Sequence, residues 1–137
     1  MTTDPVSTHD RMAHSLEIVG AAGIDIVPLF FARFYAAYPE ERERFCNRAS
    51  SEGLMVNEML AMLLAHAAQE PWLATMMRAQ VNTHHDHGDI RLEQYRIALD
   101  LLVGVLREVA GDGWNSDHDA AWAAQVAGLF AMIARFY

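Results

Sequence analysis

The sequence predicts an all-α fold, and three observations support this fold class. Apolar residues recur at spacings of three and four rather than two, which is the period of an amphipathic helix. Prolines, glycines and clusters of aspartate or asparagine divide the chain into segments of helical length. With 137 residues, 53% of them hydrophobic, the chain is long enough to bury one compact core. Because no linker or internal repeat interrupts these segments, we expect one domain over residues 1–137.

The first two helices are bounded by glycine and proline. The segment 7–19 presents one apolar face and ends before a glycine, a favourable terminator because it lacks a side chain. The segment 25–38 carries Pro28 in its first turn, where a missing N–H costs no hydrogen bond within the helix. A second proline stops this helix and opens a short turn over 40–45. Residues 46–52 are then expected to form the longest loop.

Four further helices follow this loop. Residues 53–68 are apolar over much of the helix circumference, which predicts a central helix buried on more than one side. The segment 71–85 starts at a proline, which suits a first helical position. The segment 90–109 has Asp89 as its expected N-cap, and the last helix follows Ser116, another capping residue.

The charge and composition exclude several classes of protein. Eighteen acidic and ten basic residues give a formal charge of −8, which repels phosphate backbones, so we expect no nucleic-acid partner. All the basic residues are arginine, which excludes a Walker-type phosphate lysine and a Schiff-base lysine. Cys46 is the only cysteine, so a disulfide framework and a cysteine-rich zinc site are excluded as well.

The distribution of apolar residues argues against a membrane protein. No apolar run approaches the roughly 20 residues that a spanning helix needs, because charged residues interrupt each one. Residues 1–10 contain no basic cluster followed by an apolar stretch, as a signal peptide would. We therefore expect a cytoplasmic protein with no membrane partner.

The cluster His84-His85-Asp86-His87 is the strongest candidate for chemistry, and three interpretations are open. It can be a polar helix end whose imidazoles suit the helix dipole. A frayed end can fold His85, Asp86 and His87 around a divalent ion, although the spacing is not that of a closed zinc site. The third interpretation needs one inward imidazole, as a proximal haem ligand does. His85 follows Val81 by four residues and is expected to face inward, with His84 turned toward solvent.

Several motifs, in order and spacing, carry a resemblance over residues 23–137. They are Phe34-Tyr35-Ala36-Ala37-Tyr38-Pro39-Glu40, Phe45, Leu60-Ala61-Met62, His85, Glu93-Gln94-Tyr95 and Arg107-Glu108-Val109-Ala110-Gly111-Asp112. With a tyrosine ten residues after the histidine, the sequence resembles a bacterial single-domain globin related to the globin domain of flavohaemoglobins. The resemblance implies a globin-like fold of about six main helices plus a short turn helix, enclosing a haem pocket.

The resemblance also implies roles for residues on the proximal side of the haem. His85 would ligate the iron of haem b (iron protoporphyrin IX), and Phe45 would pack against the porphyrin. Tyr95 matches a tyrosine that, with a glutamate on the last helix, hydrogen-bonds the histidine and raises its basicity. The glutamate has no match, because its place falls at or next to Tyr137. We therefore expect a weaker electron donation from the proximal side than in flavohaemoglobins.

The distal side departs further from the family pattern. Phe31 stands where the bacterial globins usually carry a tyrosine, and Val56 stands where they carry a glutamine. Without a donor to O₂, worth about 1.5–3 kcal/mol when charge-assisted, O₂ is expected to leave faster and the iron to oxidise sooner. A shift of one residue in the preceding loop would place Asn57 at the second position. Leu60 is expected to cover the haem face.

Two further residue types bear on the pocket. Met55 and Met59 border the distal region, where they are either core residues or candidates for a sixth iron ligand. His66 lies nearly three turns beyond Val56 and is expected to be outside the pocket.

The expected function is a haem-binding globin that reversibly binds a diatomic gas: O₂, CO or NO. Oxygen transport and NO detoxification both fit, but sustained NO dioxygenase turnover is expected to need a separate reductase. One alternative is a haem-free or sensory globin-like module acting through protein interaction. Another is a peroxidase-like haem enzyme, which lacks an evident distal acid–base histidine. The last two helices could pair two copies into a homodimer.

Overall fold

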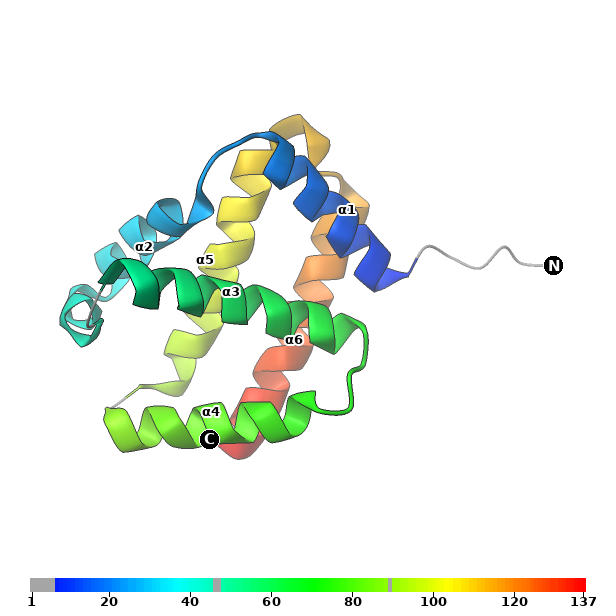
Figure 1. The fold of residues 1–137 in the computed structure, drawn as a ribbon. Helices are drawn as coiled ribbons and strands as arrows, with labels where there is room; N and C mark the ends of the chain where they lie inside the picture. The colour runs from blue at the N-terminus through cyan, green and yellow to red at the C-terminus, as the bar shows by residue number, and fades with distance from the viewer. Residues whose placement is uncertain (1–6, 46–47, 89) are drawn as a thin grey trace.

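A computed structural model describes residues 7–45, 48–88 and 90–137, and within them the only regular elements are helices (Figure 1). This confirms the predicted all-α fold class. The elements are α1 (Thr8–Ala21), α2 (Ile26–Ala37), the 3₁₀ helix η1 (Pro39–Arg44), α3 (Arg48–Ala67), α4 (Leu73–His87), α5 (Leu92–Ala110), the 3₁₀ turn η2 (Gly111–Gly113) and α6 (Ser116–Phe136).

Capping side chains fix where several helices begin. Ser7 Oγ accepts a hydrogen bond from the Asp10 N–H at 3.0 Å at the start of α1, and Asp25 Oδ1 accepts one from the Val27 N–H at 3.0 Å in α2. In α6 the cap is Asn115, whose Oδ1 accepts from the His118 N–H at 2.8 Å. The expected cap, Ser116, is therefore one residue too late.

Other predicted boundaries also move. α3 begins at Arg48, so most of the segment 46–52 is helical rather than a loop. Helix continues through Gly53 because a glycine inside a helix costs only about 1 kcal/mol. α4 begins at Leu73, two residues after the predicted start. The expected cap Asp89 lies outside the described residues.

One cluster of buried side chains draws on all six α-helices. In Figure 1, α3 and α4 run across the molecule, and α5 and α6 pass steeply behind α3. Trp122 of α6 is fully buried, and its Nε1 donates to Ser15 Oγ of α1 at 2.8 Å. Ser15 Oγ in turn donates to the Met12 carbonyl at 2.6 Å. The largest core side chain is therefore satisfied by a short polar chain from the first helix.

α3 and α6 cross closely at a glycine. Ideal geometry would put a Cβ at Gly128 within 2.3 Å of His66 Cε1. The half-buried His66 donates from Nδ1 to Gln125 Oε1 at 2.6 Å. His66 therefore joins α3 to α6 at this crossing.

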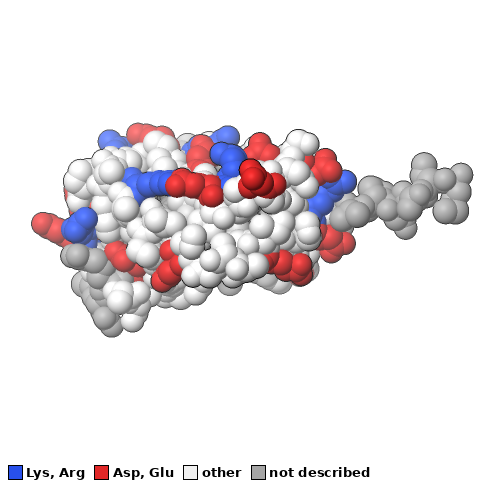
Figure 2. Space-filling view, turned by 90° about the horizontal axis from the view of Figure 1, so that it is seen from above, with Lys and Arg blue, Asp and Glu red and all other residues white. Residues whose placement is uncertain are grey.

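Charged side chains lie on the surface as mixed pairs. On the face seen in Figure 2, arginines lie beside acidic groups rather than in a continuous basic patch. Arg11 pairs with Asp117 at 2.8 Å and Arg107 with Asp119 at 2.9 Å. These exposed pairs contribute little to stability.

No single helix of the described residues is both long enough and apolar enough to cross a membrane. The helices α1 and α2 reach that length and apolar character only when they are taken together, and they are bent by 101° from each other.

Candidate functional site

Aromatic side chains of α2 form the wall at one end of the site. Phe31 packs edge-to-face against Phe34 and against Phe45, which follows η1, with ring centroids 5.9 and 5.3 Å apart. Phe31 and Phe34 are buried in the core, whereas Phe45 is half-buried. The turn after α2 thus presents Phe45 at the edge of the aromatic cluster.

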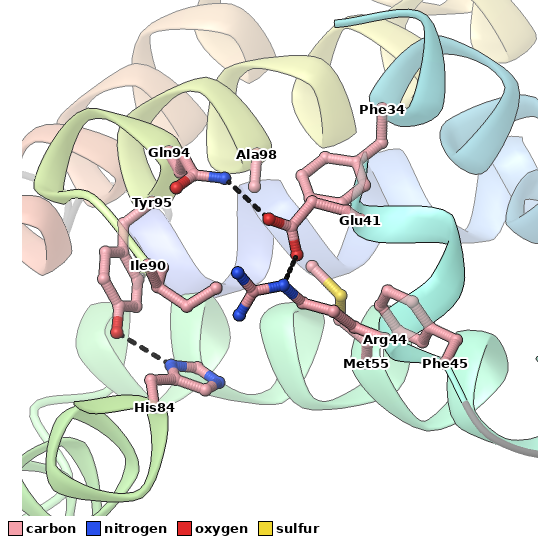
Figure 3. Close-up of a pocket in the computed structure, with 10 residues that line it drawn as sticks. All are labelled: Phe34, Glu41, Arg44, Phe45, Met55, His84, Ile90, Gln94, Tyr95 and Ala98. Atoms are coloured by element: carbon pink, nitrogen blue, oxygen red, sulfur yellow. Dashed lines mark hydrogen bonds and ion pairs between the residues drawn. The ribbon is translucent and has the colours of Figure 1, made fainter. Parts of the chain in front are cut away.

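A cavity of about 250 Å³, here called the rim cavity, opens beside Phe45 (Figure 3). It lies where η1, α3, the end of α4 and the start of α5 meet. Its lining side chains are Phe34, Glu41, Arg44, Phe45, Met55, His84, Ile90, Gln94, Tyr95 and Ala98. Half of these are apolar, and the polar ones are largely engaged with one another.

A smaller cavity of about 100 Å³, here called the inner cavity, continues toward the core. Met55, His84, Tyr95 and Ala98 line both cavities. The other inner-cavity residues are Glu58, Met59, Met62, Met77, Gln80, Leu99, Leu129 and Ile133. The two cavities are therefore adjoining spaces divided by four side chains.

A third, more open hollow lies between α3 and α4, here called the outer groove, with a volume of about 650 Å³. Its lining residues are Glu58, Ala61, Met62, Trp72, Met76, Ala79, Gln80, Thr83 and His84. Glu58 Oε2 accepts a hydrogen bond from Gln80 Nε2 at 2.8 Å, which joins the two helices directly. His84 borders all three spaces, which makes it the central polar group of the site.

His84 is hydrogen-bonded to Tyr95, a half-buried tyrosine of α5. Its Nδ1 lies 2.7 Å from the Tyr95 hydroxyl, and the ring centroids are 5.5 Å apart. Burial, and to a lesser degree Tyr137, raises the pKa of Tyr95 to about 12. The phenol therefore stays protonated at physiological pH, and its hydroxyl fixes the orientation of the imidazole.

The orientation expected for the two histidines is reversed in the structure. His85 is exposed, and its Nε2 donates to the Tyr137 carbonyl at 3.2 Å. Because α4 is a regular helix through this region, the direction of each histidine side chain follows from its position around the helix axis. The buried face of α4 is marked by three side chains that are nearly inaccessible to solvent, those of Leu73, Met77 and Val81. At about 100° per residue, His84 falls about 20° from the middle of that face and His85 about 80° from it.

The structure brings some of the predicted site residues together and separates others. Phe45 and Tyr95 line the rim cavity with His84. Phe31 and Val56 are buried in the core, and the half-buried Leu60 packs against it. None of these three lines the rim cavity, the inner cavity or the outer groove. The alternative distal residue, Asn57, is exposed.

On α3, the position of each residue around the helix axis explains why the residues that line the cavity differ from those expected. Val56 and Leu63 mark the core face of this helix. Met55, Met59 and Met62, spaced by four and three residues, mark the face that lines the inner cavity. At about 100° per residue the middles of the two faces are about 80° apart. The α3 wall of the inner cavity is therefore formed by methionines, and Met55 and Met59 line it where the sequence predicts Val56 and Leu60.

A charged cluster at the cavity rim was not foreseen from the sequence. Glu41, only 4% exposed, accepts from Arg44 Nε at 3.1 Å and from Gln94 Nε2 at 3.3 Å. The Arg44 guanidinium reaches toward the end of α4, where an ideal Cβ at Gly88 would lie 1.8 Å from Nη1. Arg44 thus extends along the rim cavity between Glu41 and His84 (Figure 3). Its one signal in the sequence is its place next to Phe45.

The described residues contain no group of three or more histidine, cysteine, aspartate or glutamate side chains arranged to hold a metal ion. Of the predicted divalent cluster, His85 and Asp86 are exposed, and the side chain of His87 lies outside the described residues.

Comparisons with known proteins find a weak relationship. No protein-family model matches the chain, and no solved structure matches it. Among curated proteins, the chain is similar to the flavohemoprotein of Rhizobium meliloti (strain 1021), with 24% identity over 129 residues. The match covers 93% of this chain and 32% of that protein, so the chain spans about a third of its relative's length. The similarity suggests a globin-like relationship.

Proposed function

We propose that this protein binds haem b between α3 and α4 and that the iron takes up a diatomic gas, O₂, CO or NO. One observation carries the proposal: an imidazole, that of His84, borders two adjoining, largely apolar cavities, and its Nδ1 is hydrogen-bonded to the hydroxyl of the half-buried Tyr95. Neutral imidazole is a common ligand of haem iron, and a hydrogen bond at the other ring nitrogen is its usual support. The weak similarity to a flavohemoprotein agrees with this chemistry.

The residues present fit a haem in polarity. Phe45, Met55 and Ala98 offer apolar surface to a porphyrin face, and His84 offers an imidazole. Arg44 offers a cation at the rim, where the carboxylates of a haem would meet solvent. Its side chain is more than one-third exposed, so the guanidinium can swing outward and widen the cavity. The contact with Glu41 would then be exchanged for one with a haem carboxylate.

The structure and the sequence resemblance favour different histidines as the iron ligand. The resemblance favours His85, which is exposed in this structure. The cavity and the bond to Tyr95 favour His84, and we propose His84 for this role. Since Nδ1 bonds to Tyr95, Nε2 is the ring atom that would ligate the metal.

Haem, when bound, supplies an iron centre with a position for a gas molecule. The chain supplies a mainly apolar wall on the α3 side, where Glu58, bonded to Gln80, is the polar exception among the lining residues. A buried hydrogen-bond donor would be worth about 1.5–3 kcal/mol to a charged acceptor. Without such a donor from α3, we expect rapid O₂ release. Any catalytic turnover of NO would draw electrons from a separate reductase.

A hemin titration tests this proposal. The wild-type protein is expected to bind one hemin, with a sharp Soret band, and to form a CO complex after reduction with dithionite. His84→Ala is expected to weaken hemin binding and to change the spectrum of the reduced form. His9→Ala, which alters a histidine of α1, should bind as the wild type does.

Two outcomes would contradict parts of this proposal. Loss of the spectrum in His85→Ala, with His84→Ala unaffected, would return the ligand role to His85. Failure of a folded, helical protein to take up hemin would overturn the haem proposal.

A haem-free module acting through protein interaction is the second candidate, and one contact favours it. The direct bond from Gln80 to Glu58 joins α3 and α4 at 2.8 Å and closes part of the space between them. A folded protein that refuses hemin would make this the better account.

A further inference from the structure

We infer that, with haem bound, the thioether of Met55 would serve as a second protein ligand of the iron beside His84. This inference rests on the proposed haem function. It would make the site a histidine–methionine pair across the space between α3 and α4. The iron would then be six-coordinate at rest, and a gas molecule would have to displace the methionine.

The placement of Met55 carries the inference. Met55 belongs to α3 and His84 to α4, and both line the rim cavity and the inner cavity. The two other residues that line both spaces, Tyr95 and Ala98, come from α5. Met55 is therefore the α3 side chain that faces the same two spaces as the imidazole (Figure 3).

The chemistry of the side chain supports the same assignment. A thioether carries no proton and pairs with histidine as an axial ligand of haem iron in proteins. Methionine has three rotatable bonds, so its sulfur can adjust its position without a movement of the helix. Met55 is half-buried and packs against the core cluster, which keeps the side chain near the cavity.

The neighbouring groups are poorer candidates for this position. Met59 and Met62 line the inner cavity but not the rim cavity. Glu58 is bonded to Gln80. The lining residues that α3 contributes to these two cavities include no imidazole, thiol or phenol. The Tyr95 phenol comes from α5 and is bonded to His84.

Methionine ligation has consequences that can be measured. It favours the ferrous state, so the reduction potential should be higher than with an open or water-filled position. Gas binding should show a rate limit set by dissociation of the methionine.

The experiment compares ferric and ferrous spectra of hemin-loaded wild type, Met55→Leu and Met76→Leu. Met76→Leu is the control, because it changes an exposed methionine that lines the outer groove and neither of the two cavities. We expect a low-spin ferric spectrum with a sulfur-to-iron charge-transfer band in the wild type and in Met76→Leu. Met55→Leu should become high-spin, with a lower reduction potential and faster CO binding.

A second measurement needs no substitution and covers the case in which Met55→Leu fails to fold. In the reduced, diamagnetic wild type, an axial methionine gives a methyl proton resonance shifted far upfield by the porphyrin ring current. A high-spin wild type that binds one hemin, and that shows no such resonance when reduced, would overturn the inference and leave the haem function standing. A low-spin spectrum that survives Met55→Leu would overturn it too. Absence of hemin uptake would overturn both.

Discussion

The hydrogen bond between His84 Nδ1 and the Tyr95 hydroxyl, 2.7 Å long, sets the character of the proposed iron ligand. Because burial raises the pKa of Tyr95 to about 12, the phenol cannot act as a phenolate at physiological pH. A neutral acceptor increases the basicity of an imidazole less than a carboxylate does. The iron is therefore expected to be less electron-rich than in a site with a proximal carboxylate.

The variant Tyr95→Phe is expected to weaken hemin binding by about 10-fold or more, the usual effect of removing a group that orients a metal ligand. The dissociation constant from a hemin titration measures this. Tyr38→Phe removes the same hydroxyl from a tyrosine that is buried and lines none of the three cavities, and it should leave the constant unchanged. Equal affinities for wild type and Tyr95→Phe would contradict the proposed positioning role.

At the residue scale the sequence predicts His85 as the inward histidine of the cluster, whereas in the structure His85 is exposed and His84 lines the cavities. The sequence favours His85 because it follows Val81 by four residues, yet a spacing of three, as for His84, also puts two residues on one side of a helix. The whole buried face, marked by Leu73, Met77 and Val81, distinguishes the two. Arg44 could not be foreseen, because its position depends on how η1 meets the end of α4.

The docking of α1 on α6 depends on a pair of histidines. His118 is 2% exposed, and its Nδ1 accepts from the Asn115 N–H at 3.2 Å. Its Nε2 therefore carries the proton and donates to His14 Nδ1 at 2.9 Å. Burial first, and His14 second, lower the pKa of His118, while Asp117 acts in the opposite direction. The folded protein thus keeps His118 neutral.

Acidification is expected to destabilise the fold through this pair. The unfolded chain takes up a proton on His118 near its ordinary pKa of about 6.5, before the folded chain does. The contribution to the free energy of unfolding is therefore complete above about pH 6.5 and decreases as the pH falls below that value. Urea unfolding between pH 7.5 and 5 measures the slope. His118→Gln should flatten it and His9→Gln should not; the same slope in all three proteins would count against this role.

The crossing of α3 and α6 gives a prediction with an internal control. Gly128→Ala would place a methyl group 2.3 Å from His66 Cε1, and that ring is held by Gln125. We expect a loss of about 1–3 kcal/mol from overpacking, which outweighs the gain in helix propensity of roughly 1 kcal/mol. Gly104→Ala meets no atom within 4 Å and should be stabilising by up to about 1 kcal/mol. Denaturant midpoints test both variants, and a stabilised Gly128→Ala would contradict the packing described.

At the element scale, the sequence predicts where the helices lie along the chain, but not which face of each helix points toward the core. The three-and-four spacing of apolar residues located all six α-helices, since each must bury one face. α3 is apolar on two faces, so the pattern alone could not decide which face meets the core and which lines the cavity. Met55, Met59 and Met62 show the cavity face only once α4 is in place.

For the whole molecule, hemin should act as a stabilising ligand. A ligand that binds only the folded state, at a free concentration 100 times its dissociation constant, adds about 2.7 kcal/mol to the free energy of unfolding. Thermal unfolding followed by circular dichroism should show a rise in Tm of several degrees with hemin. Iron-free protoporphyrin should give a smaller shift because it cannot bond to His84. Equal shifts with both compounds would argue against iron ligation.

The sequence was informative about the molecule as a whole. Length, composition and periodicity were sufficient for the all-α class, because a chain with no strand pattern must bury helices against helices. The order of its motifs pointed to a globin-like relationship, which the similarity to a flavohemoprotein supports. Two expectations stay predictions: that residues 1–137 form one domain, and that two copies of the chain pair into a homodimer.

The most direct test of the central claim is imidazole rescue of His84→Gly, followed by the spectrum of the reduced, hemin-loaded protein. If His84 holds the iron, His84→Gly should lose the imidazole-ligated spectrum and regain it when free imidazole fills the vacated space. His85→Gly should keep the wild-type spectrum without added imidazole. Rescue confined to His85→Gly would contradict the assignment, and a wild-type spectrum in both variants would contradict ligation by either histidine.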